Sequence, residues 1–224
     1  MNGYWGKPTS NIDWCERNYI KSYYIAEWYN SLSNLIPILL MLNSIKLIYY
    51  YKNKSNMLRF LYLLVIFIYI GSFIFHSTLT YFGQILDEVP MLLFLFTSFY
   101  LLNRNLLIIY LLICIILCNF IYFNNDPILS FQIPFGIINL LVVIQTIILY
   151  KKINKYGYLI RNVIIFYGFG FILWIIDQKY CNSVREYYFH AWWHILTGIG
   201  GYYWIQFIYL TKLTNNKNIL PYYD

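Results

Sequence analysis

The sequence predicts an all-α membrane protein built as a bundle of seven transmembrane helices. Of its 224 residues, 60% are hydrophobic and 11% are charged, and the mean hydropathy is +0.53, a balance too apolar for an ordinary soluble domain. Uncharged stretches of about 15 to 24 residues recur along the chain, close to the roughly 20 residues with which a helix crosses a bilayer. We expect the seven helices over residues 28–50, 60–82, 88–102, 106–123, 127–150, 161–177 and 190–211.

One membrane domain, residues 28–211, accounts for most of the chain. It follows a polar N-terminal segment, residues 1–27, which lacks the apolar core of a cleavable signal peptide. A short tail, residues 212–224, comes after it. The sequence indicates no second domain, no long linker and no internal repeat.

The basic residues predict the orientation in the membrane. The side that holds the first, third and fifth connections and the tail carries 11 of the 16 Lys and Arg, and the N-terminal side carries the other five. By the positive-inside rule, the C-terminus is cytosolic and the N-terminus extracytosolic. The net charge of +7 then reflects topology and attraction to anionic lipids. The basic residues flank spans and form no interleaved basic and aromatic segment, so nucleic acid is not an expected partner.

The three histidines are expected at one end of the bundle. His76 lies near the end of the second expected helix, and His190 and His194 lie at the start of the seventh, so all three reach the extracytosolic side. A spacing of four residues places His190 and His194 one turn apart on one helix face. Ionisable side chains inside membrane spans are costly and usually functional. Three imidazoles with an open fourth position are typical of catalytic zinc, so we expect an intramembrane zinc site.

Three more polar residues are expected near this end. Ser72 lies one turn before His76, and Asp87 follows a short turn that contains Gly83. Taken alone, Asp87 equally fits a helix cap, with Pro90 in the first turn of the third helix. Asp177 closes the sixth helix, where it either orients a histidine or is simply a charge at the membrane interface.

The N-terminal segment gathers oxygen ligands of the kind that calcium prefers. Asp13, Glu16, Asn18 and Glu27 fall within 15 residues. No EF-hand spacing is present, and spacing alone favours a solvated acidic surface over a calcium site.

Several segments resemble the alkaline ceramidases. They are GSFIFHSTLTYFGQILDEVPM (71–91), FHAWWHILTGIGGY (189–202) and the N-terminal stretch 3–35. The resemblance extends from Gly3 to about Tyr203. The S-x-x-x-H, Asp and H-x-x-x-H pattern is shared with a wider superfamily of membrane hydrolases, and the N-terminal stretch narrows it to ceramidases. Known members are seven-helix zinc amidases that split ceramide into a sphingoid base and a fatty acid.

The resemblance implies a role for each candidate residue. His76, His190 and His194 would ligate zinc, Ser72 would stabilise the oxyanion, and Asp87 would transfer the proton. Calcium would be bound by Asp13, the Trp14 carbonyl, Glu16, Asn18 and Glu27. A Cys15–Cys181 disulfide is expected from matching cysteines and from topology, because both lie on the extracytosolic side. The expected partner is a ceramide-type lipid in an endoplasmic reticulum or Golgi membrane, with a luminal N-terminus and no obligate protein partner.

Two alternative functions are open. One is a related membrane hydrolase that acts on another lipid, against which the N-terminal stretch argues. The other is a seven-helix receptor or metal transporter. A transporter would line a path through the membrane with polar groups, whereas here they gather at one end.

Overall fold

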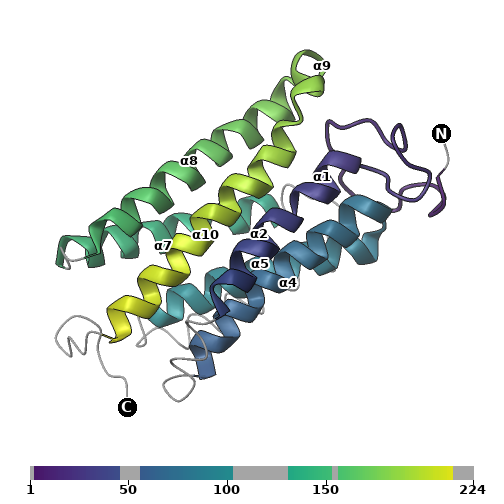
Figure 1. The fold of residues 1–224 in the computed structure, drawn as a ribbon. Helices are drawn as coiled ribbons and strands as arrows, with labels where there is room; N and C mark the ends of the chain where they lie inside the picture. Colours follow the sequence, from purple (N-terminus) through teal and green to yellow (C-terminus); the bar gives the residue numbers. More distant parts are fainter. Residues whose placement is uncertain (1–2, 46–55, 103–130, 153–155, 214–224) are drawn as a thin grey trace.

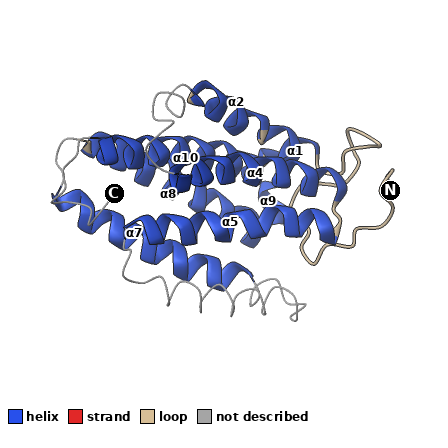
Figure 2. Cartoon of the chain, turned by 90° about the horizontal axis from the view of Figure 1, so that it is seen from below, coloured by secondary structure: helices blue, strands red, loops and turns tan. Residues whose placement is uncertain are grey.

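Helices account for nearly all regular structure in the computed structural model, which describes residues 3–45, 56–102, 131–152 and 156–213. These residues contain no β-strand beyond an isolated bridge between Gly3 and Gly6. The helices run lengthwise in an elongated bundle, and the N-terminal segment lies at the same end as α9 (Figure 1). Figure 2 shows this segment as irregular loops at the end of the bundle.

The long expected helix at 28–50 is two helices, α1 (Trp28–Ser33) and α2 (Leu35–Asn43), interrupted at Asn34. Pro37 gives the physical reason. A proline ring collides with the carbonyl of the residue four positions earlier and cannot donate to it. For Pro37 that residue is Ser33, the last of α1. The end of the expected helix lies outside the described residues.

The second and third expected helices are α4 (Asn56–Thr78) and α5 (Tyr81–Leu102), which pack along each other. The turn between them comes earlier than expected, at Leu79 and Thr80, and Leu79 has a left-handed φ of 51°. Gly83 is therefore inside α5 and not in the turn. A Cβ on Gly83 would stand 2.9 Å from the Phe75 Cα, so this glycine lets α5 pack closely on α4.

The earlier start of α5 changes the positions of Asp87 and Pro90. Both lie inside this helix, so the expected first-turn proline and the helix-cap interpretation of Asp87 are wrong. Pro90 cannot donate to the Leu86 carbonyl. Gly71 of α4 packs against that carbonyl, and a Cβ there would lie 2.0 Å from its oxygen.

The second half of the chain folds close to expectation. The helix expected at 106–123 lies outside the described residues. The remaining elements are α7 (Ile133–Lys152), α8 (Gly157–Lys179), α9 (Cys181–Val184), the 3-10 helix η3 (Arg185–Tyr187) and α10 (Phe189–Leu213). The helix α10 packs along α8 and α2. Gly198 allows a close approach to α2, because a Cβ at this position would stand 2.3 Å from the Pro37 ring.

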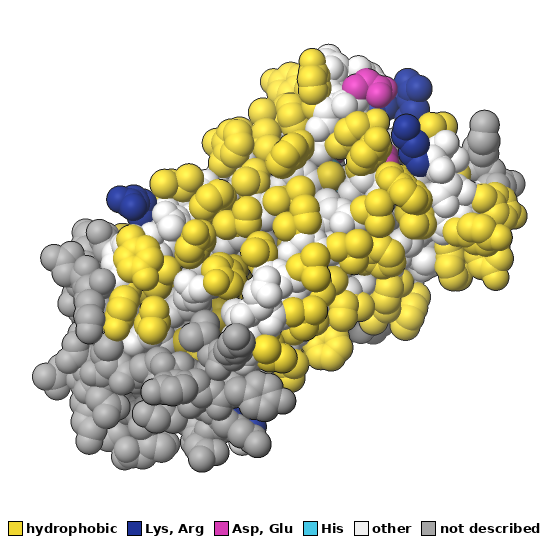
Figure 3. All heavy atoms as spheres, in the orientation of Figure 1, with side chains coloured by type: hydrophobic (Ala, Val, Ile, Leu, Met, Phe, Trp, Pro, Cys, Tyr) yellow, Lys and Arg dark blue, Asp and Glu magenta, His cyan; other side chains and the backbone are white. Residues whose placement is uncertain are grey.

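Three helices within the described ranges are long and apolar enough to cross a membrane, namely α4, α5 and α8. Large apolar side chains on them, such as Phe67 and Ile165, are exposed. Figure 3 shows hydrophobic side chains over the middle of the visible face and the charged ones toward its ends. A water-soluble surface would not carry so continuous an apolar area, so the molecule is a helical membrane protein.

The N-terminal segment docks on the α4–α5 turn through backbone hydrogen bonds. The Leu79 carbonyl accepts from the amides of Thr9 and Ser10, at 3.0 and 3.1 Å. The Glu27 amide donates to the His76 carbonyl at 2.9 Å. Carbonyls in the last turn of a helix lack intrahelical partners, so the end of α4 is a natural docking point. This places the N-terminal segment, with its acidic residues, directly beside His76.

Candidate metal centre and active site

The three histidines meet at one end of the bundle, as the sequence predicts. His76 comes from the last turn of α4, and His190 and His194 come from the start of α10. Their candidate ligand atoms lie within 4.8 Å of one another. All three side chains are at most 5% exposed. Of the described residues, these form the one group of three or more His, Cys, Asp or Glu side chains gathered in this way.

Hydrogen bonds fix the orientation of two rings. His194 Nδ1 lies 3.0 Å from the Asn30 carbonyl oxygen and 2.8 Å from Ser33 Oγ. A carbonyl oxygen can only accept, so Nδ1 carries the hydrogen and Nε2 keeps its lone pair. His76 Nδ1 lies 2.5 Å from Glu27 Oε2, and the same reasoning leaves the lone pair of His76 on Nε2 when Glu27 is ionised.

The histidines fit a bound metal ion. His76 Nε2 and His190 Nδ1 are buried and have no hydrogen-bond partner among the described residues. Buried polar atoms without partners are costly, and native proteins rarely leave them so. Metal-binding histidines usually donate their other ring nitrogen to a carboxylate or carbonyl, as His76 and His194 do. His190 is instead held by stacking on Trp14, with ring centres 3.7 Å apart.

Ser72 and Asp87 lie beside the histidines from two different helices. Ser72 is one turn before His76 on α4, and its Oγ lies 3.4 Å from His194 Nε2. Asp87 of α5 lies close enough to the Ser72 side chain to interact with it. The structure thus brings a hydroxyl, a carboxyl and three imidazoles to one place.

Ser72, Asp87, His190 and His194 line the polar end of a large apolar cavity. Its volume is about 480 Å³, within the usual range for ligand sites. Apolar side chains of α4, α5, α7, α8 and α10 line most of it. The charged or titratable side chains at its wall include Asp87, Glu88, His190 and His194. The arrangement suits a long apolar molecule with one reactive polar group.

The predicted calcium ligands also gather, at the start of α1. Glu16 accepts from the backbone amides of Tyr29 and Asn30, both at 2.9 Å. Asn18 donates to Asp13 at 3.2 Å. Glu27 Oε1 accepts from the Trp14 amide at 3.3 Å.

Burial of Glu16 and Glu27 disfavours the ionised form of both carboxyl groups. Burial raises the pKa of Glu16 to about 7, against the backbone donors that lower it. Burial also raises the pKa of Glu27 well above its usual value, and the nearby Asp13 charge adds to the shift. A cation near these carboxylates would offset both effects.

Sequence reasoning missed the part that Glu27 plays between the two sites. One oxygen faces the Trp14 amide and the other faces His76. It also missed Asn30 and Ser33, which hold His194. The signal was present, because the polar run from Asn30 to Asn34 interrupts an otherwise apolar helix.

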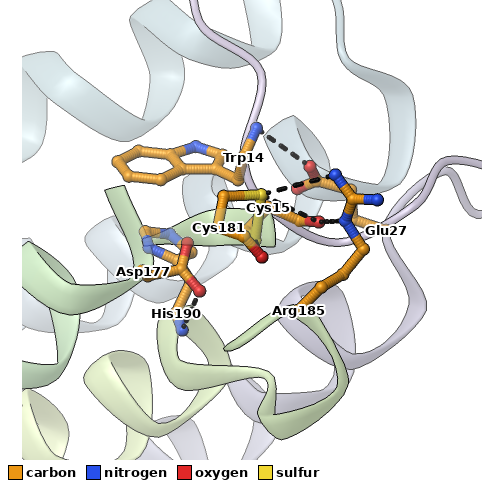
Figure 4. The surroundings of a disulfide bond; sticks show 7 residues. All are labelled: Trp14, Cys15, Glu27, Asp177, Cys181, Arg185 and His190. Carbon is orange, nitrogen blue, oxygen red and sulfur yellow. Dashed lines mark hydrogen bonds between the residues drawn. A yellow bond between two sulfur atoms is a disulfide. The ribbon is translucent and has the colours of Figure 1, made fainter. Parts of the chain in front are cut away.

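A disulfide between Cys15 and Cys181 confirms the expected pairing. It ties the N-terminal segment to α9, just before the histidine-bearing α10 (Figure 4). Arg185 strengthens the junction by donating from Nε to the Cys15 carbonyl at 3.1 Å.

Asp177 supports α10 in a way that the sequence did not predict. Its Oδ1 accepts from the His190 backbone amide at 3.3 Å, as Figure 4 shows. Of the two expectations for Asp177, the contact with a histidine is the one that its hydrogen bond matches, but this bond is made to the backbone of His190 and not to its ring. It anchors the first turn of α10, where backbone amides lack intrahelical partners.

Comparison with known proteins places this arrangement in a family. The ceramidase family model matches residues 6–223. The chain belongs to the ceramidase family. It is 33% identical to alkaline ceramidase 3 of Mus musculus, over 94% of this chain and 86% of that protein. It is 34% identical to an alkaline ceramidase of Saccharomyces cerevisiae, over 91% of this chain and 77% of that protein. It is 27% identical to an alkaline ceramidase of Arabidopsis thaliana, over 90% of this chain and 84% of that protein.

Proposed function

We propose that this chain is a zinc-dependent intramembrane amidase that hydrolyses ceramide to a sphingoid base and a free fatty acid. One observation carries the proposal. In a chain of the ceramidase family, three buried histidines come together, and two of them line the polar end of an apolar cavity. The cavity suits the hydrocarbon chains of ceramide, and the polar end suits its amide.

His76, His190 and His194 would hold the zinc. Zinc bound by three imidazoles supplies Lewis acidity and a water of lowered pKa for attack on a carbonyl carbon. Glu27, Asn30 and Ser33 keep two of the rings in the tautomer that leaves a nitrogen free to bind metal.

Ser72 and Asp87 divide the remaining chemistry. The Ser72 hydroxyl would donate to the oxygen that gains charge as the amide carbon becomes tetrahedral, an effect worth about 3 to 4 kcal/mol. Asp87 would take a proton from the attacking water and deliver it to the amide nitrogen. An amine leaves poorly until it is protonated, so this transfer is needed for cleavage. The proximity of Ser72 and Asp87 on the wall of one cavity supports a shared role.

Calcium would bind in the N-terminal segment and support the site without taking part in the reaction. Asp13, the Trp14 carbonyl, Glu16, Asn18 and Glu27 are the proposed ligands. The raised pKa of Glu16 supports this, because a cation relieves the cost of a buried carboxylate. Glu27 would pass the effect to His76.

We place the chain in the membrane as seven transmembrane helices, with a luminal N-terminus and a cytosolic C-terminus, in the endoplasmic reticulum or Golgi. The disulfide supports the luminal assignment, since disulfides persist in oxidising compartments.

The test is direct hydrolysis by purified protein in detergent or vesicles. Separate samples receive ceramide, a diacyl glycerolipid or no lipid, and mass spectrometry measures free fatty acid and sphingoid base. We expect both products from ceramide alone, in equal amounts. Fatty acid from the glycerolipid alone would instead support a related lipid hydrolase.

The metal is tested on the same preparations. Elemental analysis should find about one zinc per chain, lost when His76, His190 and His194 are all replaced by alanine. Ser183→Ala, at an exposed position on α9, is a control that should retain zinc and activity. Full zinc occupancy in the triple variant would overturn the assignment.

A further inference from the structure

Glu88 is a second acidic residue on the cavity wall, and the mechanism above does not use it. It follows Asp87 directly on α5, is 8% exposed and lines the cavity. A carboxyl group is a costly component of an apolar wall unless something bonds to it. Its position beside the reactive end therefore requires an explanation.

One of its two oxygens is held in place by Gln84. The Gln84 amide nitrogen donates to Glu88 Oε1 at 2.9 Å, and the Gln84 oxygen accepts from the Asn11 backbone amide at 2.8 Å. The Asn11 amide can only donate, so it fixes the orientation of the Gln84 side chain. Glu88 Oε1 is therefore an acceptor, and Oε2 has no hydrogen bond to the described residues.

We propose that Glu88 forms the subsite for the hydroxyl groups of the sphingoid base, the polar end of the substrate. The proposal rests on the proposed function. In ceramide the two carbons beside the amide-bearing carbon each carry a hydroxyl, so these oxygens lie close to the reacting group. Asp87 and Glu88 follow each other on α5 and both line the cavity. Adjacent side chains on a helix point in different directions, so the two carboxyls meet different parts of the same cavity wall.

The chemistry of a hydroxyl matches this position. A hydroxyl that enters an apolar cavity loses its hydrogen bonds to water and needs a replacement. It can donate to a carboxylate oxygen or accept from a protonated one, so Glu88 Oε2 satisfies it in either state. A ligand with no hydroxyl would leave Glu88 Oε2 without a partner, and sites built in this way reject such analogues strongly.

A purely structural role makes a different prediction. If Glu88 only anchors Gln84 and the N-terminal segment, its replacement should lower the hydrolysis of all substrates by the same factor. If it binds a hydroxyl, replacement should lower the hydrolysis of hydroxylated substrates selectively.

The experiment measures kcat/KM for three N-acyl substrates with the same acyl chain. They are ceramide, ceramide without its 1-hydroxyl and ceramide without its 3-hydroxyl. Each is tested on the zinc-loaded wild type, Glu88→Met and Glu88→Gln. Glu186→Met is the matched control, because Glu186 is an exposed acid on η3 outside the cavity.

For the wild type we expect a preference for ceramide over at least one of the two deoxy substrates. In Glu88→Met that preference should fall by about tenfold or more, mainly through KM. Glu88→Gln retains a group that can bond to Gln84, so it should fold and show a smaller loss. Glu186→Met should leave every ratio unchanged.

Two outcomes overturn the proposal in distinguishable ways. Equal losses on all three substrates in the folded Glu88 variants would reject the subsite and leave the proposed function intact. No ceramide hydrolysis by zinc-loaded wild type would reject the proposed function and the subsite with it.

Discussion

Replacing Glu27 with leucine should weaken zinc binding, although Glu27 is not one of the three proposed zinc ligands. The Glu27 side chain is fully buried, and its Oε2 lies 2.5 Å from His76 Nδ1. A hydrogen bond to a charged group contributes about 1.5 to 3 kcal/mol, and about 1.4 kcal/mol corresponds to a tenfold change in an equilibrium constant. The zinc Kd of Glu27→Leu should therefore rise about 10- to 150-fold, in line with losses seen when such supporting partners are removed.

The zinc Kd is measured by competition with chelators of graded affinity, after circular dichroism confirms that each variant is folded. Glu27→Gln should lie between wild type and Glu27→Leu, since its neutral oxygen can still accept from His76. Glu186→Leu is the matched control, because Glu186 is an exposed acid on η3 and is not one of the proposed metal ligands. An unchanged Kd in folded Glu27→Leu would refute the reasoning.

Three further predictions concern separate parts of the site. Asp87→Asn should keep its zinc but lose about 100-fold or more in kcat, because an amide cannot carry the proton; turnover near wild type would contradict this. Cys15→Ser should lower the melting temperature by an amount equal to Cys181→Ser, since each breaks the same cross-link, worth about 2 to 4 kcal/mol. The Glu16 pKa is raised from 4.5 to about 7, so the folded chain binds the extra proton between these values and loses stability as the pH rises through them. In chelator, melting temperature should therefore fall from about pH 5 to about pH 8, and Glu16→Gln should reduce this fall.

Hydropathy predicted the bounds of α4, α8 and α10 to within four residues, because lipid and a buried core both select long apolar runs. It could not predict where α5 begins. The turn at Leu79 depends on a left-handed φ that leucine rarely adopts, whereas the sequence favoured Gly83 as the turn residue. What holds the strained turn is tertiary, since the Leu79 carbonyl accepts from two amides of the N-terminal segment.

The histidine site was predictable because its residue types are rare in this chain and their spacing is helical. The partners that orient the rings were not predictable in the same way. Glu27 is 49 residues from His76, and Asn30 is 164 residues from His194. Such contacts depend on how α1 packs between α4 and α10, which helical periodicity does not encode.

The geometry makes the acidic segment and the histidine site parts of one unit. Glu27 bonds to the Trp14 amide through one oxygen and to His76 through the other. Trp14 in turn stacks on His190, so two of the three histidines contact residues of the acidic segment. A cation that orders this segment would therefore stabilise the ring positions of the proposed zinc site. Coupling between two binding sites is reciprocal, so bound zinc must strengthen cation binding in the acidic segment by the same factor. The N-terminal segment is thus part of the proposed metal centre and not a separate regulatory element.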